Sequence, residues 1–112
     1  MATNTLKKLF QAQLGAGDTL LYTCPALTRT TVVALYITNT DTVDRTFRLH
    51  QVDSGGSISA TNALYYDQPV TAKRTLRDGG IILEPGQLLR GLASAGAVVN
   101  VAGFGIQTTE AG

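Results

Sequence analysis

Residues 30–39 read TTVVALYITN, and this stretch decides the fold class. Its apolar residues alternate between two sides of an extended chain, with Val33, Leu35 and Ile37 on one side and Val32, Ala34 and Tyr36 on the other. A short run of this kind, rich in β-branched residues and apolar on both sides, is typical of a strand that is buried on both faces. We therefore predict a central β-strand at 30–39.

A second strand is predicted close by, at 45–52 (RTFRLHQV). Phe47 and Leu49 alternate there with polar residues, which indicates one face in the core and one face in water. The residues between the two strands, NTDTVD at 39–44, favour a turn because such side chains can bond to their own backbone. We expect the two strands to form a hairpin, and a weaker hairpin from 6–14 and 18–23 around Gly15 and Gly17.

Glycine and proline divide the rest of the chain at short intervals. We predict one helical turn followed by a strand at 64–68, and further strands at 73–77, 81–83, 87–93 and 97–107, with turns at 78–80 (DGG) and 84–86 (EPG). Gly103 and Gly105 share one face of the last strand, so another backbone or a bulky side chain is expected to approach there. Eight or nine short strands predict an all-β fold, a single antiparallel β-sandwich or jelly-roll-like domain over residues 1–112.

The composition agrees with this fold and excludes several functional classes. The chain has 112 residues, 16 threonines, 12 glycines, 15% charged residues and a formal net charge of +1. Such a charge gives no footprint for nucleic acid, and no apolar run approaches the roughly 18 residues of a membrane span. Residues 1–10 do not resemble a signal peptide, so we expect synthesis in a cytoplasm. The scarcity of charge suggests that a partner covers part of the surface.

No residue pattern supports catalysis, a cofactor or a metal. His50 is the single histidine and no nucleophile signature surrounds it, so we expect an ordinary surface residue. Cys24 is expected to be a small buried apolar residue, and one cysteine makes neither a disulfide nor a zinc site. Asp41 and Asp44 fit turn chemistry better than a calcium loop. We predict that the protein is not an enzyme.

The order of the turn motifs resembles that of small structural proteins of tailed bacteriophages. The matching segments are TNTD at 38–41, DSGGS at 53–57, ATNALYYDQPV at 60–70, GGIILEPGQLL at 79–89 and ASAGAVVNVAGFG at 93–105. Gln87 departs from this pattern, which often has an acidic residue there. The resemblance implies a non-enzymatic virion component made in a bacterial host, either a capsid decoration or cement protein or a head- or tail-associated one.

The partners implied by this resemblance are other copies of the chain, as a trimer in preference to a dimer, and the major capsid protein or other virion proteins. We expect no nucleic-acid or membrane partner. Residues 1–10 are either an extended N-terminal arm that reaches a neighbour or a plain first strand. The candidate partner-binding residues are Leu6, Leu9, Phe10, Tyr65, Tyr66, Lys73, Arg74 and Arg77.

Two alternatives remain open. The first is a tail, neck or fibre-associated structural protein. The second is a carbohydrate-binding β-sandwich, for which the Tyr65–Tyr66 pair is the available aromatic platform because the chain has no tryptophan.

Overall fold

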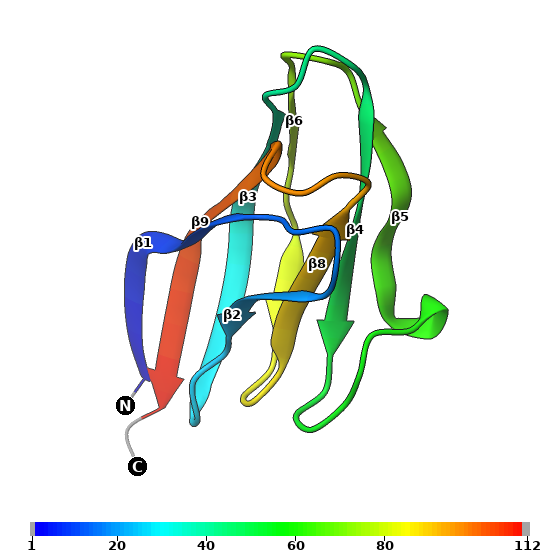
Figure 1. The fold of residues 1–112 in the computed structure, drawn as a ribbon. Helices are drawn as coiled ribbons and strands as arrows, with labels where there is room; N and C mark the ends of the chain where they lie inside the picture. The colour runs from blue at the N-terminus through cyan, green and yellow to red at the C-terminus, as the bar shows by residue number, and fades with distance from the viewer. Residues whose placement is uncertain (1, 111–112) are drawn as a thin grey trace.

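The computed structural model describes residues 2–110 as two antiparallel β-sheets packed face to face, which confirms the predicted all-β sandwich (Figure 1). The strands are β1 (Ala2–Gln13), β2 (Thr19–Thr23), β3 (Thr28–Asn39), β4 (Arg45–Val52), β5 (Ala63–Val70), β6 (Thr75–Asp78), β7 (Ile81–Leu83), β8 (Leu88–Ala93) and β9 (Val99–Glu110). The predicted helical turn before the fifth strand is the 3-10 turn η1 (Ala60–Asn62).

Consecutive strands mostly lie in opposite sheets. The five-stranded sheet has the order β1-β9-β3-β6, with β7 also on β3, and the four-stranded sheet has the order β2-β8-β4-β5. Both predicted hairpins are therefore wrong, because β3 and β4 are in different sheets, as are β1 and β2. The turn residues mark where the chain reverses, but they do not determine whether the next strand joins the same sheet or the facing one.

A bulge at Val33 sets which side chains of β3 enter the core. The pairing of β3 with β9 shifts register between Val32 and Ala34, so the alternation of sides restarts at that point. Val32, Leu35 and Ile37 are fully buried, whereas Val33 is exposed. The predicted division of faces is thus wrong at this residue, and the strand is buried on one face rather than on both.

Glycines fit closely around this bulge. A Cβ on Gly79 would overlap the Val33 carbonyl, and a Cβ on Gly105 would overlap the Thr31 carbonyl. The Gly80 N–H donates to the Val32 carbonyl at 2.9 Å, where β6 ends and β7 begins. The segment 78–80 therefore links two strands that both pair with β3, and it is not the turn of a hairpin.

The core lies between the sheets and is mostly apolar. Its largest fully buried side chains include Phe47, Leu14, Leu35, Ile37, Leu49, Leu83 and Leu89. Cys24 is buried as predicted, with its Sγ 3.0 Å from the Thr28 carbonyl. Asn39 is a buried polar residue whose Nδ2 donates to the Val43 and Val70 carbonyls, each at 2.9 Å. These bonds offset the cost of burying its amide group.

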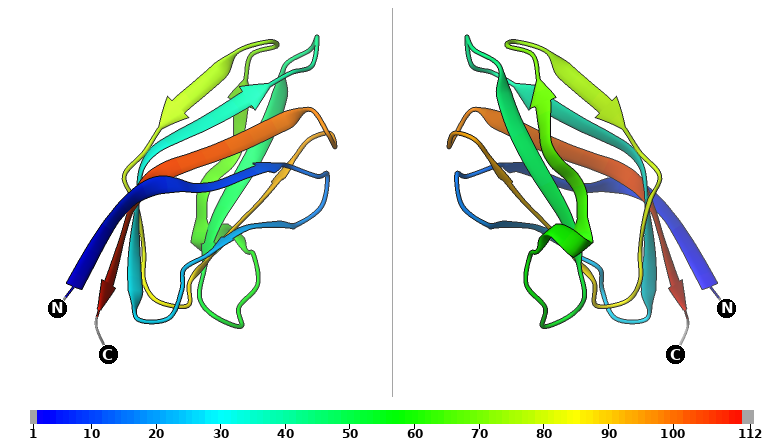
Figure 2. Two further views of the ribbon diagram at one scale, coloured as in Figure 1. Left: turned by 90° about the vertical axis from the view of Figure 1, so that its left-hand side faces the viewer. Right: turned by 90° about the vertical axis from the view of Figure 1, so that its right-hand side faces the viewer.

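Outside the four-stranded sheet, the segment between β4 and β5 covers part of the outer surface (Figure 2). His50, which the sequence placed in water, is only 2% exposed. Its Nδ1 lies 2.8 Å from Oδ1 of Asn62 in η1. The alternation of β4 identified the outer face correctly, but it could not reveal that the following segment folds back over that face. At the other sheet, β1 and β9 run out together to the end of the molecule where both termini lie.

Candidate functional site

The outward face of the five-stranded sheet carries a group of apolar side chains and is not covered by any other described part of the chain. We name it the outer apolar face, and its members are Leu6, Val33, Ala34, Tyr36, Ile82, Ala102, Phe104 and Ile106. Four of them are clearly exposed, namely Leu6 (78%), Val33 (56%), Ile82 (53%) and Phe104 (37%). Contiguous exposed apolar side chains of this kind mark interaction surfaces more often than scattered ones do.

Strand pairing brings these side chains together from positions far apart in the sequence. Ile106 of β9 is the partner of Leu6 on one side and of Thr31 on the other, and Ile82 of β7 continues the row. In the next row Phe104 pairs with Ala34, and its ring meets Tyr36 edge-on with the ring centroids 5.8 Å apart. Edge-to-face pairs are a favourable aromatic geometry, so the centre of the face is a fixed aromatic cluster.

Two basic residues flank this aromatic cluster. The guanidinium of Arg77 on β6 lies over the Tyr36 ring, 5.6 Å from its centroid. Lys8 is the cross-strand partner of Phe104 on the opposite side, and its Nζ donates to Oε1 of Gln11 at 3.2 Å. The face therefore combines an apolar centre with positive charge on two sides.

A shallow hollow of about 230 Å³ lies beside Tyr36 on the same face. It is lined by Gln11, Tyr36, Thr38, Asn100, Val101 and Ala102. The lining offers amide and hydroxyl groups and no carboxylate. This hollow could accept one side chain of a partner, with hydrogen bonds around its rim.

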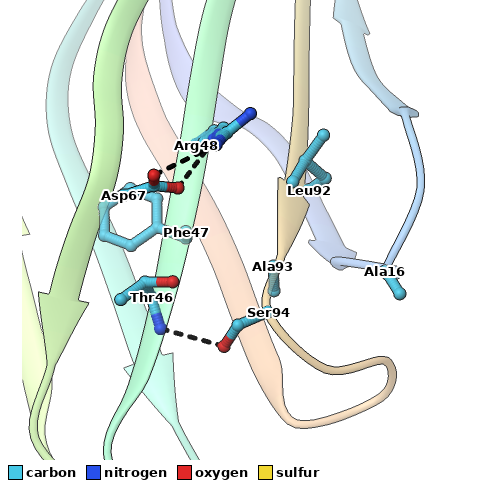
Figure 3. A pocket seen from close by; sticks show the side chains of 8 residues that line it. All are labelled: Ala16, Thr46, Phe47, Arg48, Asp67, Leu92, Ala93 and Ser94. Carbon is cyan, nitrogen blue, oxygen red and sulfur yellow. Dashed lines mark hydrogen bonds and ion pairs between the residues drawn. The ribbon is translucent and has the colours of Figure 1, made fainter.

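The opposite sheet carries a larger hollow, of about 300 Å³, which is drawn in Figure 3. Arg48 donates to both carboxylate oxygens of Asp67, at 2.7 and 3.0 Å, and the Thr46 N–H donates to Ser94 Oγ at 3.1 Å (Figure 3). The Arg48 guanidinium holds the pKa of Asp67 below its usual range. Because these polar groups already bond to one another, this hollow is a less apt docking site than the outer apolar face.

The two adjacent tyrosines of β5 point to different sides of the four-stranded sheet. Tyr65 turns inward, with its ring centroid 5.2 Å from that of Phe47, and its hydroxyl donates to Asp78. Burial, followed by the hydrogen bond to Asp78, raises the pKa of Tyr65. Tyr66 is exposed, and the Arg48 guanidinium lies 4.0 Å from its ring centroid. A sugar could therefore stack on one tyrosine ring here, not on two.

The structure separates the other candidate residues into distinct places. Leu6 lies on the outer apolar face, Leu9 lies in a bulge of β1, and Phe10 is buried in the core. Arg77 lies on the outer apolar face, while residues 73 and 74 precede β6 in a turn. Tyr36, Phe104 and Ile82 were not singled out from the sequence, because only the pairing of β3, β7 and β9 brings them together.

The described residues hold no arrangement that indicates a metal site. Within residues 2–110, no three His, Cys, Asp or Glu side chains gather as ligands. Asp41 pairs with Arg45 at 2.7 Å, and Asp44 accepts the Ala72 N–H at 2.9 Å. In the same range, no helix has the length and apolar character needed to span a membrane.

The fold has counterparts among solved structures. No protein-family model and no curated protein sequence matches this chain. A chain in the structure of infectious bursal disease virus, Gx strain, superposes on all of this chain with a TM-score of 0.51 and 12% sequence identity. A chain of the Gt strain matches 96% of this chain at 9% identity, with a TM-score of 0.47. The present chain spans about a third of those chains, 32% and 31%, and the likeness to the first shows a shared fold.

Proposed function

We propose that this chain is a non-enzymatic structural protein of a virion, and specifically a capsid decoration or cement protein that binds an assembled phage head. The observation that carries the proposal is the outer apolar face, an uncovered sheet surface on a chain with few charges. The fold shared with a chain of a solved virus structure supports a place in a virus particle. The order of turn motifs, which resembles that of tailed-phage structural proteins, supports the phage assignment.

The physical demands of such a role suit this molecule. A cement protein binds many equivalent sites, so modest individual contacts are strengthened by avidity when copies are linked to one another. Self-association fits this requirement, and we propose a trimer in preference to a dimer because threefold positions are common in capsids. The outer apolar face would then lie against the shell, and other surfaces would join the copies.

The test is the position of the protein on particles released by cells that carry its gene. Immunogold electron microscopy with antibodies against the chain should label heads. Label on tails or necks would replace the cement assignment with the tail-associated one, and particles without label would overturn both.

A matched pair of variants tests the face itself. Phe104→Asp should abolish particle binding, because it places a charge in the aromatic centre of the outer apolar face. Leu64→Asp is the control, since Leu64 has a similar exposure, 41% against 37%, on the other sheet. Equal binding by both variants would show that the outer apolar face is not the contact surface.

A further inference from the structure

The two sheets differ in how their positive charges are neutralised. On the four-stranded sheet, Arg48 pairs with Asp67 at 2.7 Å and Arg90 pairs with Asp18 at 3.3 Å. On the outer apolar face, neither Lys8 nor Arg77 has a carboxylate of residues 2–110 within 4.0 Å of its charged nitrogens. The arginines of the first surface are therefore paired within the chain, while Lys8 and Arg77 on the second surface have no carboxylate partner among residues 2–110.

None of the described carboxylates pairs with Lys8 or Arg77, and Glu110 lies near Arg29 at the end of β9. Glu84 pairs with Arg29 at 3.0 Å, at the opposite end of β3 from Tyr36 and Arg77. Asp78 accepts hydrogen bonds from Tyr65 and from the Gly79 N–H. Asp53 accepts one from Gln87 at 2.8 Å. Lys8 and Arg77 therefore remain available to a carboxylate of another molecule.

Each positive group also contacts a neighbouring side chain of the same sheet. Arg77 lies over Tyr36, whose ring is in turn fixed edge-on by Phe104. Lys8 is tied to Gln11, which lines the hollow of about 230 Å³. Such contacts restrict a side chain in part, and a restricted side chain loses less entropy when it binds a partner.

We infer that the outer apolar face docks an acidic protein surface whose carboxylates pair with Lys8 and Arg77 while its apolar side chains cover Tyr36 and Phe104. This inference rests on the proposed function, in which the outer apolar face is the contact surface. It adds the chemistry of the protein that this face contacts. A second copy docked face to face would bring like charges together, which costs affinity. A nucleic acid would leave the apolar centre without a counterpart, and the net charge of +1 is small for such a partner.

The inference can be tested in solution without particles. The probes are a ten-residue peptide that alternates Leu with Glu, a matched peptide that alternates Leu with Lys, and an oligo-dT of similar charge. Backbone amide shifts of the ¹⁵N-labelled full chain report where each probe binds. The Leu-Glu peptide should shift amides of β3, β6 and β9 around Tyr36, Arg77 and Phe104. Its affinity should fall about tenfold or more between about 50 and about 500 mM NaCl, because exposed charges are screened.

Charge reversal identifies the groups that recognise the acid. Arg77→Glu and Lys8→Glu should each weaken binding of the Leu-Glu peptide several-fold, and the double variant should bind the Leu-Lys peptide instead. Arg74→Glu is the control, since it makes the same charge change in the turn before β6. Equal weakening by the control, or shifts on the four-stranded sheet, would overturn the inference. Equal or tighter binding of wild type by oligo-dT or the Leu-Lys peptide would do so as well.

The peptide-binding experiment and the labelling of particles can give negative results independently of each other. Peptide binding at the outer apolar face without label on particles would retain an acidic partner and remove the virion assignment. Labelled heads with no preference for the acidic peptide would retain the virion assignment and remove the charge-based recognition.

Discussion

The ring of Phe10 occupies the space that a side chain on Gly103 would need. The two residues are direct partners in the pairing of β1 with β9, and both face the core. A Cβ on Gly103 would overlap the far edge of the ring, which also packs against Tyr22 with the ring centroids 5.9 Å apart. The absence of a side chain at position 103 is thus what allows the first strand to anchor in the core.

Gly103→Ala should destabilise the fold by about 1–3 kcal/mol, because the added methyl group forces the Phe10 ring out of its packed position. Urea unfolding followed by far-UV circular dichroism measures this change. In a Phe10→Leu background the same substitution should cost clearly less, since the smaller side chain leaves room for the methyl group. Strictly additive effects would show that the ring does not limit this site.

The sequence predicted the close contact at Gly103 in general terms. Two glycines on one face of the last strand predicted a close approach by a bulky side chain or a backbone, and both were found: the Phe10 ring at Gly103 and the Thr31 carbonyl at Gly105. Strand positions were also largely predictable, because alternation and turn residues are local properties of the chain. Sheet membership was not, since it depends on which strands pair across long separations.

The outer apolar face could not be predicted for the same reason, because it depends on strand pairing. Leu6 and Arg77 could be selected from the sequence as partner-binding candidates, yet nothing local indicated that they share a face with Tyr36 and Phe104. The bulge at Val33 reverses the sides of β3, and strict alternation cannot anticipate it. Likewise, the burial of His50 depends on a segment that folds back from beyond the end of its strand.

Asn62→Ala should destabilise the fold by about 1–3 kcal/mol, because it leaves a buried hydrogen-bonding group of His50 without its partner. Asn62 Nδ2 donates to the Ser57 carbonyl at 2.9 Å, and its Oδ1 accepts the Ser59 N–H at 3.0 Å. This orientation makes Oδ1 the acceptor for His50 Nδ1–H at 2.8 Å. Hydrogen exchange of residues 53–62 should accelerate in the variant.

Thr61→Ala is the control for this prediction. The Thr61 hydroxyl bonds to the exposed Ser59 hydroxyl at 2.7 Å, so its removal should change stability by less than about 0.5 kcal/mol. If the two variants unfold at the same urea concentration, the Asn62 amide does not stabilise the covering segment.

Stability should fall on acidification below about pH 4. Hydrogen bonds from Arg45, Arg48 and Tyr65 lower the pKa values of Asp41, Asp67 and Asp78 from the ordinary 3.8. A carboxylate whose pKa is lowered by folding stabilises the fold above its ordinary pKa, and this contribution is lost as the pH falls through the lowered value. Urea midpoints should therefore be level from pH 7 to about 5 and decline below about 4.

Asp67→Asn tests one member of this set. Asparagine fits the backbone at this position, because Asp67 has a φ of 54° and asparagine tolerates the left-handed region. The variant should be less stable than wild type near pH 6, and the difference should shrink toward pH 2.5. A constant difference across this range would show that ionisation of Asp67 contributes nothing to the acid response.

Deletion within β1 should separate the anchoring part of the strand from the part that is free to contact a neighbour. Residues 3–7 are all exposed, whereas Phe10 is only 7% exposed. Removing residues 2–7 should cost less than about 2 kcal/mol, because it removes exposed strand pairing and little core. Removing residues 2–10 should cost about 3–5 kcal/mol, since the Phe10 ring is lost as well.

The shorter deletion also tests the proposed arm, because it keeps the core and removes Leu6 from the outer apolar face. If the segment reaches a neighbour, the shortened protein should retain a melting temperature within a few degrees of wild type and lose binding to particles. Normal binding by this folded variant would make residues 2–7 a plain edge strand. The substitution Leu6→Asp distinguishes the two contributions of the segment: it keeps the backbone of β1 available for pairing and removes only the apolar contact. Loss of binding in both variants would assign the contact to the Leu6 side chain, and loss in the deletion alone would assign it to the free edge of the strand.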